Sequence, residues 1–321
     1  MLEISIWLGI FIVSLFLLIK ASDIFTDSAE KIGLFLGFPP FVVGVAIVAI
    51  GTSLPELMSS ISAVFQGSSE IVFGNVIGSN VANIFLIVGI ASILANRIQL
   101  KYEIASVDLP LFVGSAFLLT LMLLTEGFSI GEALLCILAY FVYLMYTMNH
   151  ADLDFGLGKE EGSNSQIETS IEGFPVRSII FLVLSTVAIY LSAKYTVRSI
   201  VMLSEILDIG KDVIAVSVLA FGTSLPELMV SIVCVRKGKG EMAVGNVLGS
   251  NIFNSLVVMG VPRLFGNLVI PTTTLNEGLL EMMFGTILMF FVVQDKQITR
   301  WEGYLFLIFY TWFIAQIFYL V

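Results

Sequence analysis

The sequence predicts an all-α polytopic membrane protein of ten transmembrane helices, arranged as two inverted five-helix repeats with broken second and third helices in each half. Composition is the first observation: 58% of the 321 residues are apolar, only 12% are charged, and the mean hydropathy is +1.01. A soluble domain carries about twice that charged fraction. The second observation is a series of long apolar runs. The third is the octapeptide GTSLPELM, which occurs at residues 51–58 and again at 222–229.

The apolar runs define the expected helices in order. A spanning helix needs roughly 20 residues, and the runs lie at about 4–22, 36–62, 70–95, 106–124, 129–149, 174–199, 210–235, 242–262, 277–294 and 301–321. The first run lacks the basic leading segment and the cleavage site of a signal peptide, and it has a counterpart in the second half, so we interpret it as a helix. We therefore expect a first repeat at 1–149, an acidic linker at 150–173 and a second repeat at 174–321.

The orientation follows from the basic residues, which favour the cytoplasmic side. If loops alternate and the N-terminus is outside, the cytoplasmic set is Lys20, Lys31, Arg97, Lys101, Lys159, Arg177, Arg236, Lys237, Lys239, Lys296 and Arg300. The outside set is Lys194, Arg198, Lys211 and Arg263. We expect a cell-membrane protein with both termini extracytoplasmic and the linker cytoplasmic. The spacing of acidic residues in that linker matches no calcium-binding loop.

Several functional classes are excluded. Cys136 and Cys234 lie in apolar runs as small buried residues, and they indicate neither disulfides nor a metal centre. A net charge of −10 argues against binding to nucleic acid, which needs a basic face. The lipid bilayer is the expected environment, and no cofactor is expected.

Self-similarity extends beyond the octapeptide. At the same offset of 171 residues, GNVIGSNVAN at 74–83 corresponds to GNVLGSNIFN at 245–254. Each repeat holds five spans, and an odd number makes the second copy enter the membrane from the opposite side. This architecture is typical of secondary transporters, whose ion sites lie near the bilayer midplane where the repeats meet.

The repeated motifs place carboxylates inside apolar helices. Glu56 and Glu227 each lie in an apolar run, where a carboxylate costs on the order of 3 kcal/mol. There is no Lys, Arg or His between Lys31 and Arg97, nor between Lys211 and Arg236. Either protons or a mobile cation must therefore neutralise the two glutamates.

The neighbouring groups suit a hard cation. Pro55 and Pro226 lack an N–H, which frees the carbonyls of Gly51 and Gly222. Further oxygens come from Thr52, Ser53, Ser79 and Asn83 and from their counterparts Thr223, Ser224, Ser250 and Asn254. With no soft ligand, this set favours Ca²⁺, Na⁺ or Mg²⁺, and a dry site suits Ca²⁺ better than Mg²⁺. Gly74, Gly78, Gly245 and Gly249 are expected to let helix backbones approach closely.

These motifs resemble the two α-repeats of the cation/calcium exchanger superfamily, and within it the compact prokaryotic sodium/calcium exchangers. The resemblance covers nearly the whole chain. It implies that the second and third helices of each half surround four cation sites, and that the first and sixth helices slide across them to alternate access. It also implies Ca²⁺ binding by Glu56 and Glu227 with the backbone oxygens of Thr52 and Thr223, and Na⁺ binding by Ser53, Ser79, Ser224 and Ser250 with the carbonyls of Ala49 and Ala220. Asn83 and Asn254 would line the middle.

The resulting hypothesis is an antiporter that exchanges Na⁺, three by resemblance, for one Ca²⁺. Some relatives, including the potassium-dependent branch, carry aspartate at the position of Asn254, so Asn254 argues against K⁺ cotransport. An H⁺-coupled cation exchanger, with the glutamates carrying protons, is the alternative. A channel or an intramembrane enzyme is disfavoured, because the repeat lies within one chain and no membrane-embedded His or Lys is present. We expect a monomer to be the functional unit and no enzymatic activity.

Overall fold

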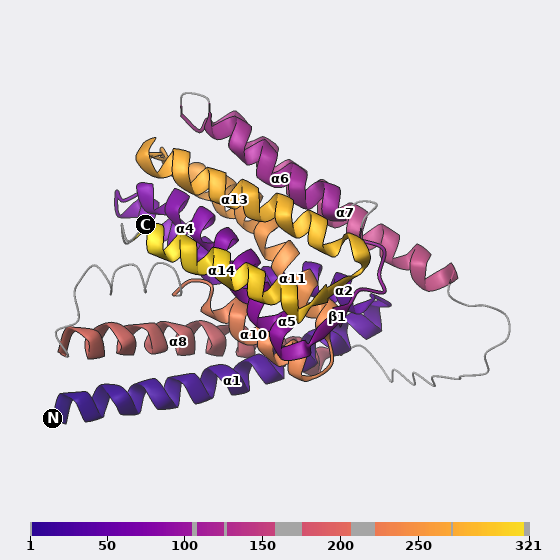
Figure 1. Cartoon of the computed structure of the whole chain (residues 1–321), viewed down its shortest axis with the longest axis horizontal. Helices are drawn as coiled ribbons and strands as arrows, with labels where there is room; N and C mark the ends of the chain where they lie inside the picture. The colour runs from indigo at the N-terminus through magenta and orange to yellow at the C-terminus, as the bar shows by residue number, and fades with distance from the viewer. Residues whose placement is uncertain are drawn as a thin grey trace.

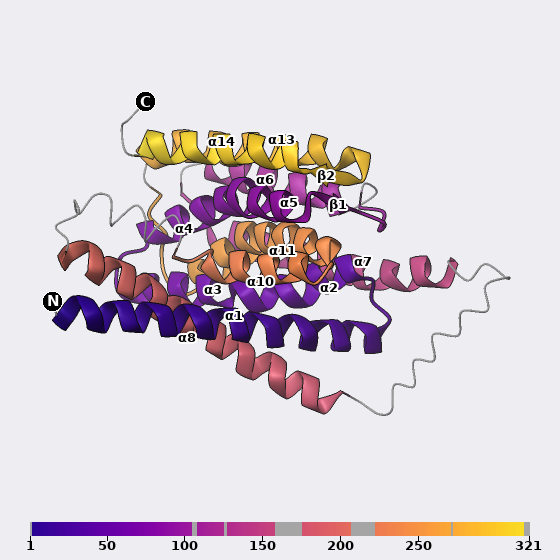
Figure 2. The same ribbon diagram turned by 60° about the horizontal axis from the view of Figure 1, so that its bottom comes forward.

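The computed structural model describes residues 2–104, 108–124, 127–157, 175–206, 222–270 and 272–317. Ala220, Lys159, Lys211 and most of the expected linker lie outside these residues. Two long helices, α1 (Leu2–Leu36) and α8 (Val176–Ile206), run side by side in opposite directions along one edge of the molecule (Figures 1 and 2). The Thr196 hydroxyl donates to Ser14 Oγ between them at 2.9 Å.

The central helices carry the repeated motifs. In the first half they are α2 (Pro40–Val43), the π-helical η1 (Gly44–Val48) and α3 (Ala49–Phe65), followed by α4 (Glu70–Val81), the π-helical η2 (Ala82–Val88) and α5 (Gly89–Ala95). In the second half they are α10 (Leu225–Arg236), α11 (Gly240–Phe253), the π-helical η3 (Asn254–Val258) and α12 (Met259–Arg263).

The remaining elements lie around this centre. They are α6 (Asp108–Leu123), α7 (Ile130–Leu157), α13 (Thr272–Val292), η4 (Val293–Asp295), α14 (Arg300–Ile317) and the strands β1 (Arg97–Gln99) and β2 (Gln297–Thr299). In the described residues, seven helical spans are long and apolar enough to cross a membrane, and α6 is a shorter apolar helix.

Two features depart from the expected all-α fold of broken helices. The strands β1 and β2 pair antiparallel with Ile98 opposite Ile298, and both side chains are buried, so apolar contact holds two loop segments together.

The second difference is the continuity of the first motif helix. In the first half, α2, η1 and α3 follow one another without a gap. Pro55 removes only one backbone donor inside α3. The wide turn of the π-helical η1 accommodates this loss, so the helix does not break.

The other motif helices differ from one another. α4, η2 and α5 are continuous, as are α11, η3 and α12. Within the described residues, α10 differs from these helices because it begins inside the motif, at Leu225 after a turn at 222–224. Its first turn contains Pro226, where the missing N–H has no helical partner to lose. The expected first helix, 4–22, is also too short, because the polar segment after Ser22 continues α1 to Leu36.

Positions 171 residues apart adopt the same local structure at the turns between the motif helices. Gly67 has φ 75° and Gly238 has φ 74°, in the left-handed region that favours glycine. The next residue in each turn, Ser68 or Lys239, donates its N–H to the carbonyl of Ala63 or Cys234 at 2.9 and 2.8 Å. Both turns therefore end their helix with the same hydrogen-bond pattern.

Close backbone contact joins the two halves. A Cβ added to Gly245 on α11 would lie 2.3 Å from the Phe41 carbonyl oxygen, and one added to Gly249 would lie 2.7 Å from Ala49 Cβ. The packing role expected for these two glycines is confirmed. No described atom lies within 4 Å of the corresponding positions at Gly74 and Gly78.

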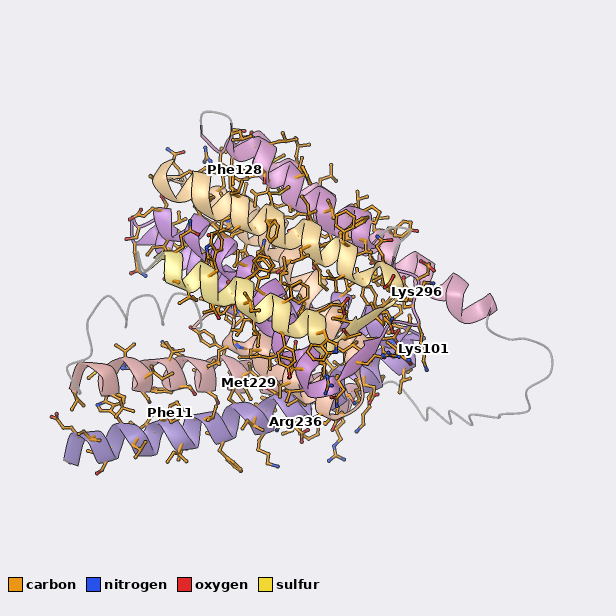
Figure 3. The ribbon with its side chains drawn as sticks, viewed as in Figure 1. Phe11, Lys101, Phe128, Met229, Arg236 and Lys296 are labelled. Atoms are coloured by element: carbon orange, nitrogen blue, oxygen red, sulfur yellow. The ribbon has the colours of Figure 1, made fainter. Side chains whose placement is uncertain are left out.

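The loops gather at two opposite ends. Lys101 and Lys296 lie together at the end where β1 and β2 meet, and Phe128 lies near the opposite end (Figure 3). At that opposite end, Arg263 Nε donates to the Phe128 carbonyl at 2.5 Å.

Candidate cation site

Two buried carboxylates lie at the centre of the site. Glu56 is on the buried face of α3 and Glu227 is in the first turn of α10; their exposed fractions are 1% and 0%. Ser53, one turn before Glu56 on α3, lies 3.0 Å from Glu227 Oε1, so the two carboxylates belong to one site. No basic side chain is paired with either of them among the described residues. Two like charges so close together, away from water, require a neutralising partner.

Hydroxyl groups from each half reach across to the other. Ser53 Oγ donates to Glu227 Oε1 at 3.0 Å. The hydroxyls of Ser79 and Thr223 are 3.1 Å apart and share a hydrogen bond. The two copies of the GTSLPE and GNxxGSN motifs are thus brought together, as the sequence predicts.

Asparagine side chains form the next part of the site. Asn83 Nδ2 donates to Asn251 Oδ1 at 2.9 Å. Asn254 is fully buried at 0% exposure, and neither of its side-chain polar atoms has a hydrogen-bond partner in the described part of the chain. Asn83 and Asn254 lie on the π-helical segments η2 and η3, whose wide turns lie at these two residues.

Unsatisfied polar atoms are concentrated at this site. Among the described residues, the buried side-chain atoms without a hydrogen-bond partner include Glu56 Oε1 and Oε2, Glu227 Oε2, Asn83 Oδ1, Ser224 Oγ, Ser250 Oγ and both Asn254 atoms. Burial of such groups without a partner costs about 1–3 kcal/mol each. Most are oxygens, so a hard cation would satisfy them. The oxygen set fits Ca²⁺ or Na⁺, which accept hydroxyl, carboxylate and amide oxygens.

The backbone ligands expected from resemblance are only partly visible. Ala49 is buried, and its carbonyl accepts a hydrogen bond from the Thr52 hydroxyl at 3.4 Å. Its counterpart Ala220 lies outside the described residues. Within those residues no group of three or more His, Cys, Asp or Glu side chains could hold a metal ion, so a cation here would need hydroxyl, amide and backbone oxygens in addition to the two carboxylates.

Two asparagines that were not predicted as site residues form hydrogen bonds to the backbone of the two glutamates. Asn75 Nδ2 donates to Ser60 Oγ at 3.1 Å and to the Glu56 carbonyl at 3.4 Å. Asn246 Nδ2 does the same for Ser231 and the Glu227 carbonyl, at 3.0 and 3.5 Å. Both follow the first glycine of the GNxxGSN motif. The repeat itself was therefore the signal that could have identified them.

The fold and site define a polytopic helical membrane protein with a buried, oxygen-lined centre suited to a cation. The chain belongs to the sodium/calcium exchanger protein family, whose model matches residues 6–149 and 177–319. The resemblance to compact prokaryotic exchangers is confirmed. The sodium/calcium exchanger MaX1 of Methanosarcina acetivorans is 35% identical to this chain, over 97% of it and 98% of MaX1.

Two further comparisons agree over nearly the whole length. An uncharacterized membrane protein of Methanocaldococcus jannaschii is 31% identical, with 96% of this chain and 97% of that protein covered. The solved structure of the sodium-calcium exchanger NCX_Mj superposes with a TM-score of 0.81 at 28% identity, covering 98% of this chain and 99% of the other. The relatives are exchangers and membrane proteins rather than enzymes.

Proposed function

We propose that the protein is a secondary antiporter that exchanges Na⁺ for Ca²⁺ across a membrane by alternating access. The observation that carries this proposal is the buried pair Glu56 and Glu227, which has unpartnered carboxylate oxygens and no basic partner in the described residues. A transported cation supplies the missing positive charge. Membership of the sodium/calcium exchanger protein family supports Na⁺ and Ca²⁺ as the substrates.

The two glutamates hold Ca²⁺ together with the backbone oxygens of Thr52 and Thr223. The flanking hydroxyls and carbonyls bind Na⁺, and these groups belong to Ser53, Ser79, Ser224, Ser250, Ala49 and Ala220. Asn83 and Asn254 line the middle of the site. This assignment is supported by the burial of the described side chains and by the unpartnered atoms among them.

The chain crosses the membrane ten times as two inverted halves, residues 1–149 and 174–321, joined by the linker at 150–173. The opposite directions of α1 and α8 support the inversion. Basic residues assigned to the cytoplasm gather at one end, where Lys237 pairs with Asp27 of α1 at 2.7 Å and β1 pairs with β2. Arg263, assigned to the outside, contacts the loop at Phe128 at the other end. Both termini are then extracytoplasmic, and the monomer is the transporting unit.

Coupling to Na⁺ is favoured over coupling to H⁺. The family and the relative MaX1 carry the name of sodium/calcium exchange, and each half supplies several hydroxyls that suit Na⁺. The test is uptake of Ca²⁺ into vesicles that contain the purified protein. A Na⁺ gradient should drive uptake, and a pH gradient of equal size at constant Na⁺ should not. Uptake driven only by the pH gradient would replace this proposal with H⁺ exchange.

A further inference from the structure

Three hydrogen bonds cross from the first half to the second at repeated positions. Ser53 donates to Glu227 at 3.0 Å, and Asn83 donates to Asn251 at 2.9 Å. The third runs from Thr52 Oγ1 to Asn246 Oδ1 at 3.1 Å. In each of these three, the donor belongs to the first half and the acceptor to the second. A longer contact runs the other way, from Asn251 Nδ2 to the Asn80 carbonyl at 3.4 Å.

If both residues of a bond are replaced by their counterparts 171 residues away in the other half, the result is a second possible bond, here called its mate. In each mate the donor would lie in the second half and the acceptor in the first. The mate of Ser53–Glu227 is Ser224–Glu56. In the described part of the chain, Ser224 Oγ and both Glu56 carboxylate oxygens have no hydrogen-bond partner. This mate is therefore not formed, although both of its residues are at least 97% buried.

The other two mates are not formed either. The mate of Asn83–Asn251 is Asn254–Asn80, and among the described residues Asn254 Nδ2 and Asn80 Oδ1 both have no partner. The mate of Thr52–Asn246 is Thr223–Asn75. Asn75 Oδ1 also has no partner there, because the Thr223 hydroxyl is bonded to Ser79 instead.

Cation binding explains only part of this pattern. Glu56, Ser224 and Asn254 are proposed cation ligands, and a bound ion would satisfy them. Asn75 and Asn80 lie outside that set, yet the Oδ1 atom of each is buried and has no hydrogen-bond partner in the described residues. Each of these atoms is the acceptor of an unformed mate. A buried acceptor without a partner is costly. A second arrangement in which the mates form would satisfy these acceptors.

We propose that Asn75, Asn80, Asn246 and Asn251 are positioning residues of a two-position hydrogen-bond switch. The three bonds formed in this structure are exchanged for their mates when the site opens to the opposite side of the membrane. In an inverted repeat the two access states are related by exchanging the roles of the halves, so one set of bonds belongs to each state. The inference rests on the proposed antiport.

Ser255 holds the switch in its present position. Asn80 Nδ2 donates to Ser255 Oγ at 2.9 Å. The residue that corresponds to Ser255 in the first half is Ile84, whose side chain cannot accept a hydrogen bond, and Asn251 Nδ2 donates instead to the Asn80 carbonyl at the longer distance of 3.4 Å. Loss of the Ser255 hydroxyl should release Asn80 and favour the mate Asn254–Asn80.

The matched variants Asn75→Ala and Asn246→Ala test the proposal. Each loses the same bonds within its own half, to a serine and to a glutamate carbonyl. They differ in which set of crossing bonds they weaken. The measurement is the apparent KM for Ca²⁺ in Na⁺-driven flux, taken separately at each face with right-side-out and inside-out vesicles. When the population that faces one side decreases, the apparent KM for Ca²⁺ rises at that face and falls at the other.

The ratio of the two KM values should move in opposite directions in the two variants, by roughly fivefold each, the change expected for one buried neutral hydrogen bond. The double variant should return the ratio toward that of the wild type. Ser255→Ala should move it in the direction of Asn246→Ala. A change in the same direction for both asparagine variants, or none, would overturn the proposal.

If the asparagine variants do not fold, Ser255→Ala decides alone. It must raise the apparent KM at one face and lower it at the other, and an equal change at both faces would overturn the switch. Failure of the antiport itself would be recognised separately, as wild-type vesicles without Na⁺-driven Ca²⁺ uptake.

Discussion

Ser53 Oγ donates to Glu227 Oε1 at 3.0 Å, so the first half of the chain binds the carboxylate of the second. Glu56 receives no equivalent bond in the described residues. The two glutamates are equivalent by repeat but differ in their surroundings. Glu227 also lies in the first turn of α10, where the positive end of a helix dipole stabilises a carboxylate, whereas Glu56 lies within α3.

Neutralising either glutamate should abolish Ca²⁺ transport. Glu56→Gln or Glu227→Gln removes a charged ligand, worth on the order of 3 kcal/mol, so Ca²⁺ flux should fall by more than about a hundredfold. Glu70→Gln, at the exposed start of α4, is the control and should transport normally. Vesicle flux and elution as a single folded species are the measurements. Near-normal flux in a well-folded Glu56 or Glu227 variant would contradict the assigned site.

Transport should be independent of K⁺. Asn254 supplies a neutral amide, whereas the family resemblance implies aspartate at this position in the potassium-dependent branch, so we expect the site to lack one negative charge for an additional cation. Na⁺-driven Ca²⁺ flux measured with K⁺ or with choline on the Ca²⁺ side should be equal. A requirement for K⁺ on that side would show that the inference from Asn254 is wrong.

A methyl group at Gly245 should destabilise the contact between the halves. Gly245→Ala would put a Cβ 2.3 Å from the Phe41 carbonyl oxygen, and such overpacking costs about 1–3 kcal/mol or more. The melting temperature in detergent should fall by several degrees. Gly114→Ala on α6 is the control, because no described atom lies within 4 Å of its Cβ position. Equal melting temperatures for the two variants would argue against close packing at Gly245.

Features of the site that depend on spacing along the chain could be predicted from the sequence, and contacts between distant segments could not. The repeat identified Glu56, Glu227 and their neighbours because spacing along the chain is a local property. The crossing partners could not be derived in the same way, since Thr52 and Asn246 are far apart in sequence and meet only through packing. The strand pair at Ile98 and Ile298 also depends on contact between distant loops.

Helix continuity was mispredicted for a related reason. A proline signals a missing donor, but whether a helix breaks there depends on how the surrounding turns adjust. In the first half the π-helical η1 widens the helix before Pro55, and α3 continues. In the second half the same motif begins a helix at Leu225. Identical sequence therefore adopts two structures, and only the tertiary environment distinguishes them.

Lys237 should contribute a salt-sensitive part of the stability. Its Nζ lies 2.6 Å from Asp23 and 2.7 Å from Asp27 of α1. Partial burial acts to lower the pKa of Lys237, but its hydrogen bonds to these aspartates outweigh that effect and raise the pKa. Because the aspartates are almost half exposed, the cluster is worth about 1 kcal/mol at most.

Lys237→Met should therefore lower the melting temperature slightly at low ionic strength, and the difference from the wild type should shrink in 1 M salt. Lys31→Met, at an exposed position of α1, should have little effect at either salt concentration. A loss of stability that does not change with salt would indicate that packing of the lysine stem, rather than its charge, is what matters.

Na⁺ and Ca²⁺ should compete for the site, and their exchange should move net charge. With both glutamates ionised, the empty site carries a charge of −2, which is expensive to move through apolar surroundings. One Ca²⁺ or two Na⁺ neutralises it, and a third Na⁺ gives +1. The buried hydroxyls of Ser53, Ser79 and Ser250 provide oxygens for that third ion. Three Na⁺ against one Ca²⁺ then transfers one net charge per cycle, worth about 2.3 kcal/mol per 100 mV.

Two measurements test this coupling. Ca²⁺ flux in vesicles clamped with K⁺ and valinomycin should depend steeply on the membrane potential, and Ca²⁺ binding should weaken steeply as Na⁺ is titrated. Glu227→Gln is the informative variant for binding, because with one charge removed Na⁺ and Ca²⁺ should both bind weakly. Ca²⁺ flux that does not depend on the membrane potential would exclude transport of a third Na⁺. Ca²⁺ binding that Na⁺ leaves unchanged would exclude a shared site, since two ions that need the same carboxylates cannot bind independently.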